Sequence, residues 1–503
     1  SPPPDDVPDD LAELTSVTHG AVVGLGGTLA LRALRFLLNL VLAQGLGVAA
    51  YGVYAFGYRL ATMLTRLGQL GTRPTLVRLL PKHDDDERRN RTLGIAYAMV
   101  VATAGLLAAG LFALAPTISA HTLDDPLFVD VLRLFALFLP FNALVWVVTA
   151  WFQSLEMVAH QTGVFMVALP GAQLLGAGAA LLAGFSVLGV VAGMTIAVAL
   201  VFVASFAVAL SRTGLRPVVC RSRSEVREFA AFALPTTAAT LGALLRGRID
   251  VLLVGALLSS SAAGIYNVAF LLAGLISVPL AAFNQLFPPV ASRLYSNDRM
   301  DDLLSVYSTV TRWIFTVAVA VASVEVVYGA QLLGLFGDAF ARGETVLLLF
   351  VGAMLVGTSV GATGWLLMMT DHQYVEAANS WALGLLNVVL SVALIREFGL
   401  VGAAMGTGGA LALVNVVRLV ELYHFEGLQP FTRKYLKPLG AALAMGAAMQ
   451  FVAVVAPLSG GALVVVGLAV GLAVFVAVLR GLGIEDRDRV LVGSLARRYG
   501  ADG

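Results

Sequence analysis

About fourteen apolar segments, each long enough to cross a lipid bilayer, follow one another along this chain of 503 residues. A membrane-spanning helix needs roughly 20 apolar residues, and glycine, proline and charged clusters separate the segments here. The composition agrees, because 59% of the residues are hydrophobic and only 13% are charged, unlike a soluble globular protein. The sequence therefore predicts an all-α polytopic membrane protein.

Lysine and arginine are concentrated in every second loop, while the alternate loops are short or acidic. The positive-inside rule places the basic loops in the cytoplasm, so both termini are predicted to be cytoplasmic and the spans even in number. The predicted location is the plasma (cytoplasmic) membrane. The residues behind this orientation are Lys82, Arg88, Arg89 and Arg91; Arg212, Arg216, Arg221, Arg223 and Arg227; Arg293 and Arg299; Arg433, Lys434 and Lys437; and Arg480, Arg487, Arg489, Arg497 and Arg498.

An internal repeat appears when the chain is compared with itself about 212 residues further on. YGVY at 51–54 matches AGIY at 263–266, and LGVVAG at 188–193 matches VGAAMG at 401–406. The offset spans six helices, so the copies share one orientation and predict two six-helix lobes with pseudo-two-fold symmetry. The predicted parts are a disordered cytosolic tail (1–19), an N-lobe (20–211), a basic cytoplasmic linker (212–228), a C-lobe (229–424), helices 13 and 14 (425–482) and a cytoplasmic C-terminal tail (483–503).

Several function classes lack support in the sequence. The acidic, proline-rich start is the opposite of a cationic signal peptide, so the first spanning helix is expected to direct insertion. The single Cys220 precludes an intrachain disulfide, and no metal-ligand spacing, nucleotide-binding loop or catalytic motif is found. We expect no enzyme activity, cofactor or metal, and the net charge of +1 gives no indication of a nucleic-acid partner.

The first apolar segment, residues 20–44, carries Arg32 and Arg35 near its middle. A central arginine costs at least ~2.5 kcal/mol to insert. Because the two residues are three apart they share a helix face, and Asn39 lies a further turn along it. This face is expected to line a water-filled cavity between the two lobes.

Further charges occur in helices two and seven. Arg59 and Arg66 are seven apart and share a face, although Arg59 could instead reach the headgroups from the helix end. On helix seven, Arg246 and Asp250 are four apart and can pair along the helix, while Arg248 points about 200° away from Arg246. Pairing across helices for stability is an alternative to a binding role for all of them.

Acidic residues within the membrane are few, namely Asp250 and Glu325. Guanidinium groups bind phosphate and carboxylate in bidentate fashion, so the cavity candidates indicate an anionic substrate. One alternative is an ion-coupled antiporter of cations or drugs that uses Asp250 and Glu325. A membrane enzyme or a scaffold for glycan assembly is a further alternative, without a catalytic constellation to support it. The tryptophans, Trp146 among them, are interpreted as interface anchors or packing rather than as a sugar platform, and the intramembrane amides, such as Asn142 and Gln173, as hydrogen-bond partners between helices, a minority of which contact substrate.

Residues 42–83, LAQGLGVAAYGVYAFGYRLATMLTRLGQLGTRPTLVRLLPKH, are similar to the opening segment of Wzx-type polysaccharide flippases, and the helix layout resembles that family throughout. Its superfamily also holds lipid II flippases and multidrug and toxin extrusion transporters. The resemblance implies alternating-access transport of an oligosaccharide on a polyprenyl or dolichyl (pyro)phosphate to the outer leaflet. The lipid II branch stays open, whereas the missing carboxylate on helix one disfavours the drug branch. Implied partners are the lipid-linked oligosaccharide, membrane lipids, glycan-assembly enzymes and a coupling ion, and the implied head-binding residues are Arg32, Arg35, Arg59, Arg66, Arg246 and Arg248.

Overall fold

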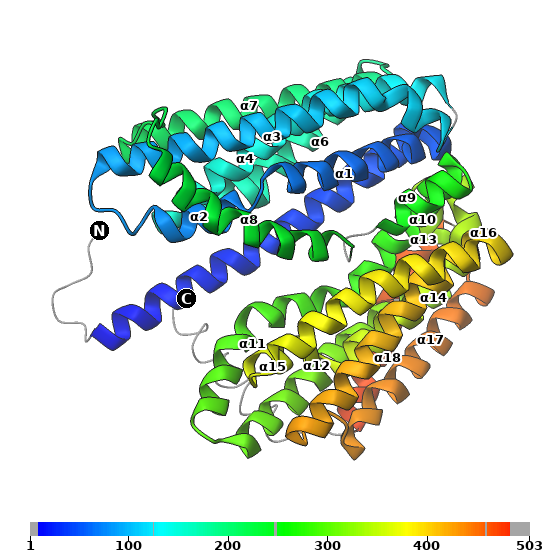
Figure 1. Cartoon of the computed structure of the whole chain (residues 1–503). Helices are drawn as coiled ribbons and strands as arrows, with labels where there is room; N and C mark the ends of the chain where they lie inside the picture. The colour runs from blue at the N-terminus through cyan, green and yellow to red at the C-terminus, as the bar shows by residue number, and fades with distance from the viewer. Residues whose placement is uncertain (1–8, 124, 246–248, 458–459, 483–503) are drawn as a thin grey trace, which may run out of the picture. The chain divides into compact units, whose positions relative to one another are not determined.

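The structure, a computed structural model, describes residues 9–123, 125–245, 249–457 and 460–482, and every regular element within them is helical (Figure 1). The α-helices are α1 (Asp9–Gly68), α2 (Thr72–Leu79), α3 (Asp86–Ala120), α4 (Pro126–Ser154), α5 (Val158–Thr162), α6 (Leu169–Leu182), α7 (Val187–Thr213), α8 (Arg223–Leu245), α9 (Ile249–Leu257), α10 (Ser260–Ala273), α11 (Val278–Ser296), α12 (Met300–Val327), α13 (Gly329–Gly334), α14 (Glu344–Val360), α15 (Thr363–Met369), α16 (Gln373–Glu426), α17 (Lys437–Val455) and α18 (Gly460–Gly481). Four short elements join them: the π-helix η1 (Gly163–Ala168) and the 3₁₀-helices η2 (Gly274–Ser277), η3 (Asp338–Gly343) and η4 (Arg433–Leu436).

Within the described residues, eleven helical stretches are long and apolar enough to cross a membrane. Two of them hold two predicted segments each, because α1 breaks at Gly47 (φ 73°) and α16 breaks at Gly399 (φ 56°). Glycine suits both positions, since a positive φ strains any residue with a Cβ atom. In addition, α8 and α9 flank residues 246–248 and cover the predicted seventh segment. The all-α polytopic fold is confirmed, and about fourteen crossings are consistent with it.

The predicted disordered tail over residues 1–19 is wrong for its second part. Residues 9–19 belong to α1, which begins at Asp9, while residues 1–8 lie outside the described part of the chain. The stretch DDLAELTSVTH contains several good helix formers. The prolines of this start, at positions 2–4 and 8, all precede this stretch and so do not interrupt it.

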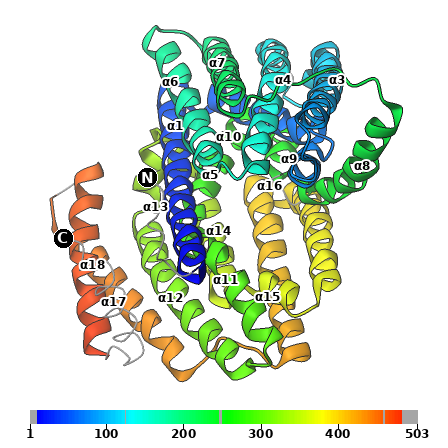
Figure 2. The ribbon, with the colours of Figure 1, turned by 90° about the vertical axis from the view of Figure 1, so that its left-hand side faces the viewer.

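The chain forms two compact units whose boundaries differ from those of the predicted lobes. The first unit comprises residues 1–271, 336–346 and 374–414, and the second comprises residues 272–335, 347–373 and 415–503. In the second unit, α17 and α18 lie side by side (Figure 2). They share an apolar cluster with α12, to which Phe315, Tyr328, Met445 and Phe475 contribute. The division into two six-helix lobes stays a prediction.

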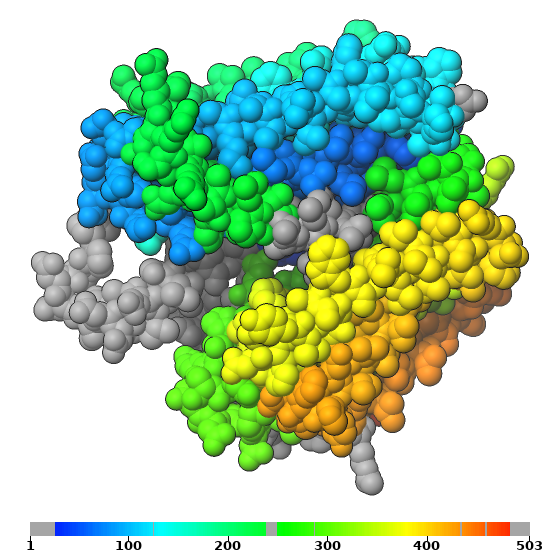
Figure 3. Space-filling view, in the orientation of Figure 1, coloured from blue at the N-terminus to red at the C-terminus, as the bar shows by residue number. Residues whose placement is uncertain are grey.

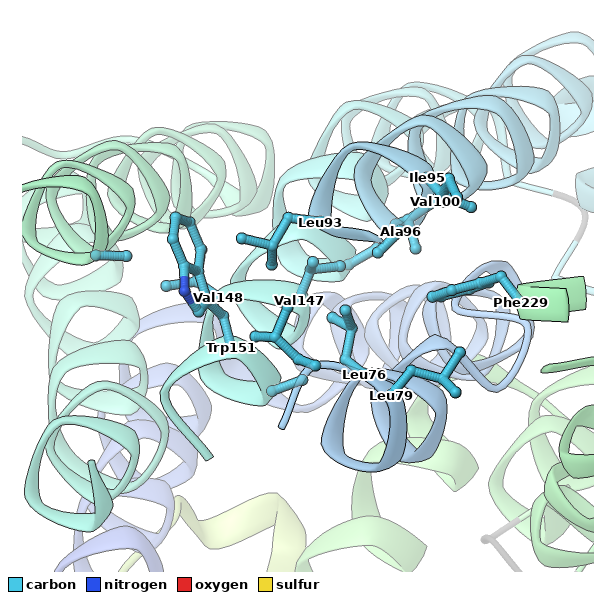
Figure 4. Close-up of a cluster of buried hydrophobic side chains, with 14 of the residues drawn as sticks. Leu76, Leu79, Leu93, Ile95, Ala96, Val100, Val147, Val148, Trp151 and Phe229 are labelled. Carbon is cyan, nitrogen blue, oxygen red and sulfur yellow. The ribbon is translucent and has the colours of Figure 1, made fainter. Parts of the chain in front are cut away.

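A large apolar core in the first unit lies where α2, α3, α4 and α8 meet (Figure 4). Trp151 of α4 is fully buried in this core, and Leu76 of α2, Leu93 of α3 and Phe229 of α8 also belong to it. The space-filling view shows α8 lying directly against α2 and α3 (Figure 3). This core fixes α4, whose neighbouring face carries cavity residues described below.

The two copies of the sequence repeat contact each other at their matching glycines. A Cβ atom on Gly52 would overlap the carbonyl of Ser260 and lie 3.2 Å from the backbone nitrogen of Gly264. Small residues allow membrane helices to approach this closely. The other matching glycines, Gly193 and Gly406, also have similar surroundings. Gly193 packs on the backbone of Gly176, and Gly406 packs on the backbone of Ser391. These parallel contacts support the predicted duplication.

Backbone hydrogen bonds join the basic linker between α7 and α8 to the start of α3. Asn90 accepts from the backbone N–H of Arg216 through Oδ1 at 2.7 Å and from that of Val218 through its carbonyl oxygen at 3.1 Å. Gly94 permits this approach, because a Cβ atom there would overlap the carbonyl of Val218. The predicted basic linker is therefore an ordered strap.

An ion pair adds to this strap. Arg91 Nε lies 3.0 Å from Glu225 Oε2, while its Nη1 lies 2.7 Å from Glu87 Oε1. Burial acts to raise the pKa of the Glu225 carboxyl, but the hydrogen bonds from Arg91 and Cys220 and the charge of Arg91 outweigh it, so this pKa lies below its usual value. Burial also raises the pKa of the Cys220 thiol, which lies 3.3 Å from Glu225 Oε2.

Candidate functional site

A polar cavity of about 270 Å³ lies in the first unit, lined by both arms of α1 together with α4, η1, α6 and α10. Its lining combines guanidinium groups, side-chain amides, hydroxyl groups and aromatic rings, and it includes no aspartate or glutamate among the described residues. The lining residues are Arg35, Leu38, Asn39, Tyr54, Ala55, Tyr58, Arg59, Thr62, Thr65, Arg66, Asn142, Trp146, Phe165, Leu169, Pro170, Gln173, Asn267 and Leu271.

Three predicted arginines meet at this cavity. Arg35 comes from the first arm of α1, and Arg59 and Arg66 come from the second arm, which follows the break at Gly47. Arg59 and Arg66 share a face, as their spacing predicted. Arg35 and Arg66 are exposed to the cavity and form no ion pair within the described residues. The cavity therefore carries positive charge that is suited to a bidentate anion.

A short hydrogen-bond chain holds the arm that carries Arg35. The Tyr51 hydroxyl donates to Asn39 Oδ1 at 2.6 Å and accepts from Asn267 Nδ2 at 2.8 Å. Asn39 Nδ2 in turn donates to the carbonyl oxygen of Arg35 at 2.7 Å. Asn39 thus lies at the cavity, and its amide ties the helical turn of Arg35 to the second arm and to α10.

The other predicted site residues lie elsewhere. Arg32 is half-buried on α1 and is not among the residues that line the cavity. Arg246 and Arg248 lie outside the described residues, so the expected pairing of Arg246 with Asp250 stays a prediction.

Asp250 is buried away from the cavity lining, in a polar cluster of the first unit. The Tyr266 hydroxyl donates to Asp250 Oδ2 at 2.6 Å and lies 2.8 Å from Thr407 Oγ1. Thr407 and Ser391 both donate to Asn387 Oδ1 at 3.1 Å. Tyr266 belongs to the second copy of the repeat, so the duplicated motif holds this carboxylate.

Glu325, the other intramembrane acid, lies in the second unit on α12. Its side chain is 1% exposed, and neither carboxyl oxygen has a hydrogen-bond partner among the described residues. It does not line the polar cavity. The two carboxylates considered for cation antiport are thus both absent from the described cavity lining.

Among the amide and aromatic residues of the cavity, sequence reasoning named only Asn39 as a site residue and assigned Asn142, Gln173 and Asn267 mainly to hydrogen bonds between helices. Tyr54 and Tyr58 stack with ring centroids 5.6 Å apart, and Trp146 packs on Phe165 at 4.5 Å. Trp146 was interpreted as an anchor or packing residue, and it does both pack and line the cavity. The sequence contained a signal for part of this lining. Polar or aromatic residues at positions 58, 59, 62, 65 and 66 lie on one face of an otherwise apolar helix, which indicates a face turned away from lipid.

Solved structures establish the class of fold. The chain superposes on the lipid II flippase MurJ in an inward closed conformation with a TM-score of 0.72 and 11% identity, covering 90% of this chain and 96% of that one. It also superposes on an inward-facing multidrug resistance MATE family transporter of the MOP superfamily, with a TM-score of 0.67 and 13% identity, covering 81% and 98%. The fold is thus the one that lipid flippases and MATE transporters share.

The family itself follows from the sequence match. The family model described as "Polysaccharide biosynthesis protein" matches residues 17–294, and the chain belongs to this family. The resemblance to Wzx-type flippases is therefore confirmed.

The chain is 30% identical over 141 residues to the EPS I polysaccharide export inner membrane protein EpsE of Ralstonia nicotianae, covering 28% of this chain and 31% of that protein. It is 23% identical over 192 residues to the probable low-salt glycan biosynthesis flippase Agl15 of Haloferax volcanii, covering 38% and 40%, so the matches span less than half of either relative.

Proposed function

We propose that this protein carries a lipid-linked oligosaccharide from the cytoplasmic to the outer leaflet by alternating access. The observation that carries the proposal is the convergence of Arg35, Arg59 and Arg66 on one cavity whose described lining has no carboxylate. The phosphate or pyrophosphate of the carrier binds these guanidinium groups while the isoprenoid tail stays in lipid. Family membership supports a glycan as the cargo.

Electrostatics explain why such a cavity is needed. An ionised group is extremely costly to place in hydrocarbon, and an unpaired arginine is costly in the membrane as well. Binding brings the two charges together in a wet cavity, where each charge-assisted hydrogen bond contributes about 1.5–3 kcal/mol. The cycle requires no covalent step, so the protein acts as a transporter rather than as an enzyme.

The orientation proposed from the loop charges can be tested separately. We propose that both termini and the strap between α7 and α8 are cytoplasmic. In a Cys220→Ser background, Ser222→Cys is then expected to be shielded from a membrane-impermeant maleimide in right-side-out vesicles. Ser259→Cys, in the predicted outer loop between α9 and α10, is expected to react. The reverse pattern would overturn this orientation.

The transport proposal is tested in proteoliposomes with a labelled lipid-linked oligosaccharide. We expect Arg35→Gln and Arg66→Gln each to lower the rate of translocation by about tenfold or more, from the loss of one charge-assisted contact. Arg299→Gln is the matched control, because Arg299 is exposed, lies outside the described cavity lining and pairs with its neighbour Asp302 at 2.8 Å. Equal transport by all variants of equal thermal stability would refute the role of the cavity. Transport of lipid II instead would assign the chain to that branch.

A further inference from the structure

One side of the cavity carries no charge. The α4 residues Asn142 and Trp146 and the η1–α6 residues Phe165 and Gln173 line it, whereas α1 supplies all the arginines. Amides and aromatic rings suit a neutral, hydroxyl-rich ligand better than a phosphate. The cavity thus has a cationic side on α1 and an uncharged side of amides and aromatic rings on α4, η1 and α6.

The indole of Trp146 is held in place by protein contacts alone. Phe165 packs against it at a centroid distance of 4.5 Å and an interplanar angle of 59°, and the guanidinium carbon of Arg73 lies 5.4 Å from the ring centroid. Arg73 is itself fixed, because its Nε and Nη2 donate to Gln153 Oε1 at 3.1 and 2.9 Å. Trp146 is therefore a preorganised flat surface at the cavity.

The amide groups beside it have unused hydrogen-bonding capacity. Gln173 is 3% exposed, lines the cavity, and forms no side-chain hydrogen bond with any described residue. Asn142 is 5% exposed and donates one long bond, 3.4 Å, to Thr65 Oγ1. Buried amides normally find partners. Neither amide atom of Gln173 is among the fully buried atoms that lack a partner, so the amide is open to the cavity, where water or a ligand can bind it.

We propose that Asn142, Trp146 and Gln173 form a sugar subsite that binds the ring next to the phosphate of the lipid carrier. The C–H face of the sugar packs on the Trp146 indole, and its hydroxyl groups exchange hydrogen bonds with the two amides. This subsite rests on the proposed function, because the arginines of the same cavity hold the phosphate. The arginines and these three residues line the same cavity of about 270 Å³.

The experiment compares the binding of two probes by purified full-length protein: a polyprenyl methyl phosphate, and the same lipid phosphate carrying one hexose in place of the methyl group. Both are diesters with one negative charge, so they differ only in the sugar. We expect Trp146→Leu and Gln173→Leu each to lower the ratio of the two affinities, glycosylated over unglycosylated, by about tenfold. Trp381→Leu, at an exposed position outside the cavity lining, is the matched control and is expected to keep the parental ratio. Arg66→Gln is expected to weaken both probes together and to keep the ratio as well.

The outcomes separate the subsite from the proposed function. An unchanged ratio in Trp146→Leu and Gln173→Leu, with arginine variants that weaken both probes, would overturn the sugar subsite alone. If the parent bound neither probe, or if Arg66→Gln bound both normally, the proposed function and the subsite would fall together. Should Trp146→Leu fail to fold, Trp146→Phe and Gln173→Leu decide the question, and a parental ratio in both overturns the subsite.

Discussion

Replacing Gly52 by alanine tests the close contact between the two copies of the repeat. The new Cβ atom would lie 2.5 Å from the carbonyl carbon of Ser260, whereas carbon atoms pack best at ~3.5 Å or more. The carbonyl oxygen of Ser260 would lie closer still, so the second arm of α1 and α10 must separate by more than about 1 Å. The two obstructing atoms, the carbonyl carbon and oxygen of Ser260, belong to the backbone, so no side-chain rotation relieves the overlap.

The magnitude follows from two opposing effects. Overpacking of this kind typically costs about 1–3 kcal/mol, and a shift of 1 Å also forfeits much of the dispersion energy around the contact. Alanine regains up to about 1 kcal/mol of helix propensity. We expect a net loss of roughly 2 kcal/mol, which lowers the midpoint of thermal unfolding by roughly 4 °C, scaled from smaller proteins.

The assay is thermal unfolding of purified protein in detergent, followed by intrinsic fluorescence. The matched control is Gly105→Ala on α3, where the added Cβ atom meets nothing within 4 Å and only the gain in helix propensity applies. If Gly52→Ala unfolds at the same temperature as the parent, or at a higher one, the backbones of the two repeats do not approach as described.

Three further substitutions test the buried polar groups and the strap. Tyr51→Phe removes the hydroxyl that joins Asn39 and Asn267. Because both amides face the cavity and can bind water instead, we expect the free energy of unfolding to fall by only about 1 kcal/mol, as measured by thermal unfolding. Tyr374→Phe, at an exposed position, is the control and should leave stability unchanged. The pKa of Glu225 is lower in the folded protein than in the unfolded chain, where it is about 4.3, so the ionised carboxylate stabilises the fold above about pH 4.3. This contribution to stability is lost as the pH falls through the pKa of Glu225 in the folded protein. The difference in unfolding temperature between the parent and Glu225→Gln should therefore shrink below about pH 4, and a constant difference would contradict the ion pair with Arg91. Glu325→Met should raise the unfolding temperature, since it removes two buried oxygens that have no partner among the described residues, and a lower temperature would reveal an unseen contact.

Helical periodicity and charge placement predicted much of the cavity. Arg59 and Arg66 share a face because they are seven residues apart, and both line it together with Arg35 and Asn39. Arg32 shows the limit of this reasoning. It is three residues from Arg35, yet it does not line the cavity, because the cavity extends over only part of the helix. Spacing gives the face of a helix but not how far along that face a cavity reaches.

The sequence by itself determined the membrane fold, the repeat and the cationic character of one helix face. These features depend on hydrophobic length, on similarity at a fixed offset and on residue spacing, and all three can be read from the order of residues without knowing which helices pack together. Only the tertiary structure decided that Trp146 and Gln173 share a cavity with those arginines, and that Asp250 is instead bonded to Tyr266. The physical reason is that these partners lie on different helices, and their side chains meet only through helix packing, which the sequence pattern of a single helix does not encode.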